Sequence, residues 1–369
     1  MAHADAPAPP DRPRFESIQA LRGAAVMMVV LYHLGMVEAK YGGNTLLPRA
    51  VGAGAAGVDL FFAISGFVMA TVMRGAFRGP GSAGAFLLRR IERIYPPYWC
   101  YTLAVLVVRA WRPAWVNSSQ GGRIDPVASL LLIPSELLPA LMVGWTLVFE
   151  MGFYLVMAGF LLFLPERRFP TALGAWAAAV AAGSLLLGDR GGPWLRTVFN
   201  PMSLEFIAGA GLSLLFHAGR LRLRYPAAWI ALGFAAMAAG YPFYAGVAEH
   251  ACAGDWARCL VFGAPACLIL AAAVSAGTGG RRPPGWLRRA GDASYSTYLS
   301  HVLVLSALGR LWSLRAGPGA WDNVLALPAL FLAALAAGWA SYRWLETPLL
   351  AWFRKRLPGG SPAFRMRSR

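Results

Sequence analysis

The chain has few charged residues for its length. Of its 369 residues, 57% are hydrophobic and only 14% are charged, whereas a soluble domain carries about 25% charged residues. The polar surface is therefore too small to cover a soluble globule of this size, and the same composition excludes a disordered chain. Apolar runs of about 20 residues are abundant instead, which indicates a protein that crosses a membrane several times.

Lysine is scarce as well. Among 34 basic residues only Lys40 and Lys355 are lysines, and neither lies in the glycine-rich context of a P-loop. The net charge of +17 is spread over arginines that lie between apolar runs, so we expect these side chains to contact anionic membrane lipids and not nucleic acid. The G-x-S-x-G, H-E-x-x-H and G-x-G-x-x-G motifs are also missing, so no hydrolase, zinc protease or Rossmann domain is indicated.

Cysteine is equally sparse, with four in the whole chain. None forms a C-x-x-C pair with a histidine nearby, so no zinc or haem motif is present and we expect no metal. A disulfide between Cys252 and Cys259 remains the less favoured alternative to free thiols.

Hydropathy predicts an all-α polytopic membrane protein with about ten transmembrane helices. The expected spans are 20–37, 54–73, 95–110, 144–164, 171–188, 201–217, 226–246, 258–276, 293–313 and 323–342. Residues 127–141 are apolar too, but Pro134 and Pro139 interrupt them. We therefore expect this piece to be interfacial or re-entrant, with an eleventh span as the alternative.

The distribution of basic residues predicts the orientation. If the N-terminus is cytoplasmic, the inner segments hold 23 of the Lys and Arg residues and the outer segments hold 8. This asymmetry is typical of a protein with both termini in the cytoplasm. We expect a flexible cytoplasmic tail at 1–16, one membrane domain at 17–356 and a basic cytoplasmic tail at 357–369.

Ionisable residues inside spans are functional candidates, because placing one there costs a few kcal/mol or more. Arg22 and His33 lie eleven residues apart on the first span. This spacing is about 20° off three full helical turns and roughly 16 Å along the axis, so both side chains face the same side at two depths. For Arg22 the alternative is snorkelling to the lipid headgroups.

Three acids are expected in the outer half of the membrane near the depth of His33, namely Asp59, Glu150 and Glu205. A histidine beside a carboxylate is a candidate general base, because the carboxylate fixes its tautomer and stabilises the imidazolium. Helix capping or pairing with an arginine is the alternative for each acid, and it is favoured for Glu205. His301 lies in the middle of a span, where a structural role and a functional one are equally favoured.

A second charged cluster is expected on the inner side. Arg89, Arg90 and Arg93 precede the third span on an amphipathic helix, at the i, i+3 and i, i+4 spacings that place them on one face. Planar guanidinium groups suit phosphate. The alternative is a surface helix bound to lipid phosphates.

Several of these residues belong to motifs distributed along residues 15–356. The motifs are Ser17–Gly23 followed by Leu31-Tyr32-His33, Gly57–Phe67, Arg90-Ile91-Glu92-Arg93 before Tyr95-Pro96, Gly144–Tyr154, Ser294–His301 and Glu346-Thr347-Pro348. Together they resemble the acyltransferase-3 family of integral membrane proteins, whose R-x10-H pattern matches at Arg22 and His33. The chain departs from many members at Met151, where they carry a second acid.

The resemblance implies an enzyme that moves an acyl group, commonly acetyl from acetyl-CoA, to a hydroxyl of a carbohydrate. The expected acceptor is exopolysaccharide or a lipid-linked sugar, and the expected location is the bacterial cytoplasmic (inner) membrane. Other members acylate macrolides or lipids, so these acceptors stay open. A polytopic transporter or flippase is the rival from another class, although no inverted repeat is visible in the sequence.

The expected mechanism is direct attack. His33 would deprotonate the acceptor hydroxyl, and Asp59 or Glu150 would support the imidazolium. Arg22, Arg89, Arg90 and Arg93 would hold the acyl-CoA. An acyl-enzyme formed on Ser65 or on His33 itself is the competing route.

Overall fold

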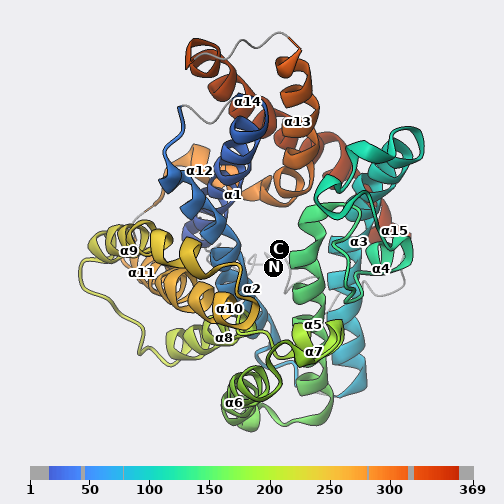
Figure 1. Cartoon of the computed structure of the whole chain (residues 1–369). Helices are drawn as coiled ribbons and strands as arrows, with labels where there is room; N and C mark the ends of the chain where they lie inside the picture. Colours follow the sequence, from blue (N-terminus) through green and yellow to red (C-terminus); the bar gives the residue numbers. More distant parts are fainter. Residues whose placement is uncertain (1–15, 43–45, 78, 281, 315–319, 357–369) are drawn as a thin grey trace, which may run out of the picture.

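The computed structural model describes residues 16–42, 46–77, 79–280, 282–314 and 320–356, and within these ranges every regular element is a helix. Figure 1 shows the helices as a bundle, with α1, α2, α9 and α11 on one side and α3, α4 and α5 on the other. The predicted tails at 1–16 and 357–369 lie outside the described residues, apart from Glu16.

Each of the ten predicted spans corresponds to a long helix. The bounds are α1 Glu16–Val37, α2 Gly57–Met73, α3 Pro80–Trp111, α5 Trp145–Phe163, α6 Phe169–Leu187, α8 Ser203–His217, α9 Pro226–Val247, α11 Ala264–Thr278, α13 Ser294–Ser313 and α14 Ala320–Ser341. Shorter helices connect them, namely α4 Pro126–Leu131, α7 Pro193–Val198, α10 Ala251–Arg258, α12 Gly285–Asp292 and α15 Thr347–Arg356. The expected all-α membrane class is confirmed.

Eight helical stretches in the described chain are long and apolar enough to cross a membrane, and they contain all the long helices except α3 and α13. These two have 32 and 20 residues, or about 48 and 30 Å at 1.5 Å per residue, against a hydrocarbon core of about 30 Å. Both are therefore long enough. They differ from the other spans in polar content, because α3 carries the arginine cluster and α13 carries His301 with several serines.

The apolar piece at 127–141 folds back along α3. It contains only the six-residue helix α4, capped by the Asp125 carboxylate, which accepts from the Ala128 N–H at 2.9 Å. Three aromatic side chains of α3 donate to carbonyls at its other end: Tyr98 to Ser129 at 2.6 Å, Trp99 to Leu130 at 2.8 Å and Tyr95 to Leu131 at 2.8 Å. Such donors satisfy carbonyl groups at the C-terminal end of this short helix. The segment is not among the helical stretches of the described chain that are long enough to cross a membrane, and its interfacial or re-entrant placement stays a prediction.

Two glycines bring the backbones of α2 and α8 into direct contact where these helices cross. A Cβ on Gly66 of α2 would lie 1.9 Å from the Phe206 carbonyl oxygen of α8, and one on Gly209 would lie 2.0 Å from the Ala63 carbonyl oxygen. Helices in membranes associate through such small residues because lipid supplies no hydrophobic drive between them. The α2–α8 pair is thus a rigid wall of the bundle.

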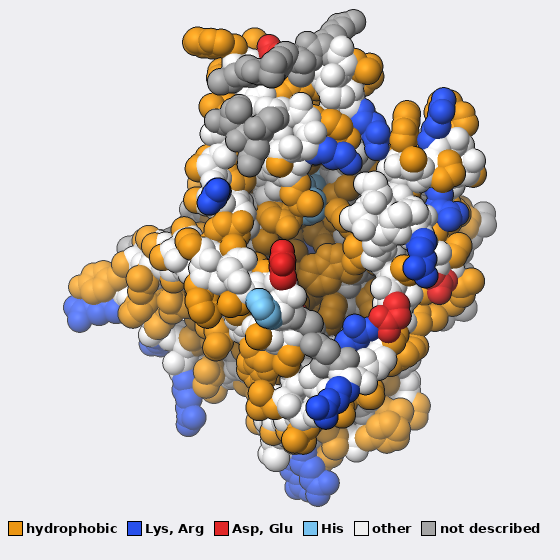
Figure 2. Space-filling view, viewed as in Figure 1, with side chains coloured by type: hydrophobic (Ala, Val, Ile, Leu, Met, Phe, Trp, Pro, Cys, Tyr) orange, Lys and Arg blue, Asp and Glu red, His pale blue; other side chains and the backbone are white. Residues whose placement is uncertain are grey.

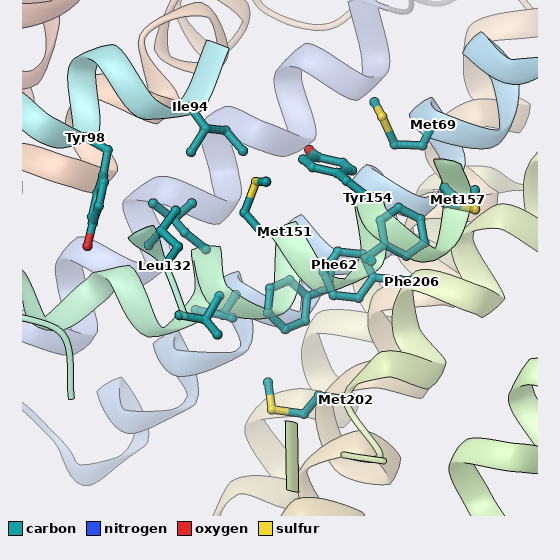
Figure 3. Packing of buried hydrophobic residues seen from close by; sticks show 14 of the residues in the cluster. Phe62, Met69, Ile94, Tyr98, Leu132, Met151, Tyr154, Met157, Met202 and Phe206 are labelled. Atoms are coloured by element: carbon teal, nitrogen blue, oxygen red, sulfur yellow. The ribbon is translucent and has the colours of Figure 1, made fainter. Parts of the chain in front are cut away.

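Aromatic rings fill the space between this wall and α5. The Phe206 ring stacks on Phe62 of α2 at 4.3 Å and on Phe153 of α5 at 4.6 Å between centroids. Figure 3 shows Phe62 and Phe206 among the methionines of this cluster, Met151 included. The packing fixes α5 relative to α2, and these two helices carry Glu150 and Ser65.

Candidate active site

A hollow separates the two sides of the bundle. Figure 2, viewed as in Figure 1, shows the molecule open between the side that holds α1 and α2 and the side that holds α3 and α5. Its wall is mostly hydrophobic, and a histidine side chain is visible inside it. Side chains from α1, α2, α3, α5 and α13 form the two polar groups described next.

The first group is a pair of histidines. His33 Nδ1 on α1 lies 3.2 Å from His301 Nε2 on α13, and the two rings meet edge to face at 4.8 Å between centroids. His301 is 0% exposed, whereas His33 is partly exposed. The accessible imidazole is therefore backed by a buried one.

Backbone carbonyls fix the tautomers of both rings. His301 Nδ1 lies 2.8 Å from the Tyr298 oxygen and 3.1 Å from the Thr297 oxygen, and a carbonyl only accepts, so this nitrogen carries the proton and Nε2 is bare. His33 Nδ1 lies 2.9 Å from the Val29 oxygen, so it too carries a proton and shares it with His301 Nε2. The remaining nitrogen, His33 Nε2, is unprotonated and has the form of a general base.

The second group centres on Glu150 of α5. The Ser65 hydroxyl of α2 donates to its carboxylate at 3.2 Å, and the Tyr154 hydroxyl, one turn further along α5, donates to the same oxygen. The Arg90 guanidinium of α3 lies over the Tyr154 ring at 6.0 Å. Glu150 is thus tied to the arginine cluster through Tyr154.

Arg22 joins this second group. Its charge interacts with Arg93, Glu346 and Glu150, and Glu346, on the π-helical turn Tyr342–Glu346, accepts a hydrogen bond from Ser296 at 2.6 Å. Arg22 and Arg90 therefore both lie near Arg93. Arg89 lies beside Arg90 and Glu92.

Asp59 and Glu150 do not take the place predicted for them beside His33. The Asp59 carboxylate, 0% exposed, is held at both oxygens by Arg258 of α10, at 3.1 Å from Nε and 2.9 Å from Nη2. Glu205, 2% exposed, interacts with this pair. Among the described residues neither carboxylate hydrogen-bonds to His33, and support of the imidazolium by Asp59 or Glu150 stays a prediction. The sequence places Arg258 at the edge of a span, where nothing local reveals that it faces Asp59 across 199 residues.

The surroundings of Met151 explain why an apolar residue is favoured at this position, where many family members carry an acid. Its side chain is 9% exposed and belongs to the apolar cluster around Phe153 and Tyr154 (Figure 3). A carboxylate there would be buried among hydrocarbon without a partner, which is strongly unfavourable. Glu150 is accordingly the acid of this turn that faces the polar group.

Within the described residues no group of three or more His, Cys, Asp or Glu side chains could hold a metal ion. The four cysteines are free, so the alternative disulfide between Cys252 and Cys259 is not formed.

Comparison with known proteins decides the family. A family model described as an acyltransferase domain matches residues 15–343. The chain belongs to the acyltransferase-3 family. It is therefore a membrane O-acyltransferase, and the rival interpretation as a transporter loses its basis.

Several relatives of this acyltransferase align over most of its length. It is 35% identical over 320 residues to exopolysaccharide production protein ExoZ of Rhizobium meliloti, covering 82% of this chain and 92% of the relative. It is 26% identical to acyltransferase MdmB of Streptomyces mycarofaciens, with 95% of each chain covered. Peptidoglycan O-acetyltransferase OatA of Listeria monocytogenes is 24% identical, and the match covers 90% of this chain and 55% of OatA. No solved structure matches.

Three groups of the acyltransferase make contacts that the sequence does not predict. His301 could be found from its place in the Ser294–His301 motif, but its contact with His33 could not. Tyr154 lies four residues after Glu150, so helical spacing puts both on one face. Glu346 is part of the closing motif, yet nothing in its neighbourhood indicates that it lies near Arg22.

Proposed function

We propose that this enzyme transfers an acetyl group from acetyl-CoA to a hydroxyl of a carbohydrate, either exopolysaccharide or a lipid-linked sugar, in the bacterial inner membrane. The observation that carries the proposal is the contact of His33 Nδ1 with the Val29 oxygen and with His301 Nε2, which leaves Nε2 of this partly exposed ring to accept a proton. The names of two relatives, an exopolysaccharide production protein and a peptidoglycan O-acetyltransferase, support a polysaccharide acceptor.

The donor is proposed to bind at the arginine cluster. Arg22, Arg90 and Arg93 come together in the N-terminal halves of α1 and α3, the halves that the charge distribution assigns to the cytoplasmic side, where acetyl-CoA is made available. Guanidinium groups suit the phosphates of CoA, with Arg89 beside them. The extended pantetheine arm would then carry the thioester toward His33, which lies roughly 16 Å from Arg22 along α1.

The proposed chemistry is direct transfer. His33 Nε2 takes the proton of the acceptor hydroxyl while the hydroxyl oxygen attacks the thioester carbonyl. Collapse of the tetrahedral adduct then breaks the carbon–sulfur bond. The leaving thiolate then receives the proton from His33. During this time His301 Nε2 accepts a hydrogen bond from His33 Nδ1–H and stabilises the imidazolium.

Glu150 and Asp59 receive different roles in this scheme. Glu150 orients Tyr154 and, through it, the donor end of the site. Asp59 is a structural partner of Arg258. An acyl-enzyme on Ser65 is the second candidate route, because its hydroxyl donates to the Glu150 carboxylate, which is the geometry of an activated nucleophile.

The test uses the full chain purified in lipid nanodiscs with [14C]acetyl-CoA. Free CoA should appear together with labelled carbohydrate when neutral oligosaccharides are supplied, and His33→Ala should lower both signals by about 10²-fold or more. Mass spectrometry of quenched protein detects acetyl-Ser65 if the second route operates. Release of CoA with label on a lipid or a macrolide, and never on sugar, would contradict the proposed acceptor.

A further inference from the structure

A cavity of about 170 Å³ lies beside the apolar piece at 127–141. The loop that leads into α4 and the loop that follows it form one wall, and the first turns of α5 with Thr197 of α7 form the other. The α4 segment is held by α3, and α5 is held by the stacked rings of the core, so both walls are fixed. Residues 120–149 thus enclose a preformed site that the chemistry described so far does not use.

Three polar side chains of this cavity each use one atom to hold the loop. Asp125 Oδ1 caps α4, Gln120 Oε1 accepts from the Leu138 N–H at 3.1 Å, and Ser135 Oγ accepts from the Leu137 N–H at 3.3 Å. Among described residues, no partner is seen for Asp125 Oδ2 or for the amide nitrogen of Gln120. These groups are anchored and still have hydrogen bonds to offer, which is what a ligand with several hydroxyls requires.

Aromatic surface completes the lining. Trp145 and Phe149, one turn apart on α5, both border the cavity, and their rings meet edge to face at 5.9 Å. Arg258 lies over the Trp145 ring at 5.7 Å. No acceptor for the Trp145 indole N–H occurs in the part of the chain that the structure describes. An immobilised indole offers an apolar face and one polar donor, which suits a molecule with apolar faces and polar edges.

The volume of the cavity and the charges around it limit the kind of ligand that it can bind. An apolar cavity of about 150 Å³ holds one benzene ring, so a cavity of about 170 Å³ is limited to a single ring of a longer chain, and the rest of that chain stays outside. The ionisable groups at the cavity are Asp125 and Glu136, and Glu136 forms an ion pair with Arg196. An anionic sugar would meet the Asp125 carboxylate, so a neutral ring is favoured over a uronate.

We propose that this cavity binds one neutral pyranose residue of the acceptor, an inference that rests on the proposed function. Its position suits that task. Trp145 faces the cavity, while the next residue, Thr146, lies 2.8 Å from the Tyr298 hydroxyl, and the Tyr298 ring packs 5.8 Å from the His301 ring. The start of α5 therefore joins the sugar cavity to the histidine pair.

The experiment measures binding without acetyl-CoA. Saturation-transfer NMR on the protein in nanodiscs, with cellotetraose as the probe, should give a signal that Trp145→Ala weakens at least tenfold in Kd. Trp194→Ala on α7 is the matched control, because Trp194 is exposed and does not line the cavity. Asp125→Asn retains a capping residue and should weaken binding less than Trp145→Ala. Tetragalacturonate should bind at least tenfold more weakly than cellotetraose.

Three results would overturn the sugar site: no cellotetraose signal with the wild-type protein, equal loss in Trp145→Ala and Trp194→Ala, or equal binding of the two tetrasaccharides. A failure of the proposed function can be distinguished from a failure of the sugar site. Cellotetraose binding without acetyl transfer to any sugar would refute the proposed function but not the site. Acetyl transfer to sugar without binding at Trp145 would refute the site but not the function.

Discussion

Two buried polar pairs in this protein have opposite character. Asp59 and Arg258 satisfy each other through two hydrogen bonds, and the carboxylate is completely enclosed. His33 and His301 satisfy only the inner nitrogens, so that one ring nitrogen of the partly exposed His33 remains available. The role of an ionisable residue within a span therefore depends on its partner. The Asp59–Arg258 pair has its hydrogen-bonding groups satisfied and holds helices together, whereas the His33–His301 pair leaves one nitrogen available for chemistry.

The largest effect is expected when the His33–His301 pair is broken. His33→Ala should lower turnover by about 10² to 10⁴-fold, since this is what a general base contributes. The variant should still insert and bind acetyl-CoA, as measured by CoA release and by equilibrium binding of the donor in nanodiscs. Wild-type activity should rise with pH as the imidazole loses its proton, because only the neutral ring can accept one. Near-normal turnover in a well-inserted variant would refute the assignment.

Breaking the Asp59–Arg258 pair should lower the stability of the folded protein. Arg258→Met leaves the Asp59 carboxylate buried without a partner, which costs about 3 to 5 kcal/mol. We expect a large loss of folded, monodisperse protein, measured by thermal unfolding and size-exclusion chromatography in one detergent.

The double variant Asp59→Leu/Arg258→Met is the control for this prediction. It removes both charges and should recover most of the stability, because a well-packed apolar pair replaces a buried ion pair at little cost. If Arg258→Met kept full stability and lost only turnover, the pair would belong to the chemistry after all.

A smaller effect is expected at His301, which acts through His33 as a positioning residue. His301→Leu removes the acceptor for the His33 Nδ1–H, and a hydrogen bond to a charged group contributes about 1.5 to 3 kcal/mol. Turnover should fall about tenfold to hundredfold. His301→Gln restores an acceptor oxygen and should recover part of the loss in kcat without changing KM for acetyl-CoA. Equal loss in both variants would indicate a packing role only.

The smallest effect concerns the arginine cluster. Arg90→Ala and Arg93→Ala should raise KM for acetyl-CoA by about tenfold and change kcat less, because phosphate contacts far from the reacting carbon bind ground state and transition state alike. Arg112→Ala, beyond the other end of α3, is the matched control and should leave KM unchanged. Wild-type KM in both test variants would identify the cluster as a helix bound to lipid phosphates.

The helices and the family could be predicted from the sequence, which also makes His33 the candidate base. Hydropathy and helical period act over neighbouring residues, so they locate the ten long helices, the interrupted segment at 127–141, the spacing of Arg22 and His33 and the common face of Arg90 and Arg93. The partners of these residues are visible only in the tertiary structure. Asp59 contacts Arg258 across 199 residues, and His33 contacts His301 across 268 residues. These pairs depend on which helix faces the close crossings and stacked rings bring together, and the residues next to each in the sequence do not reveal that.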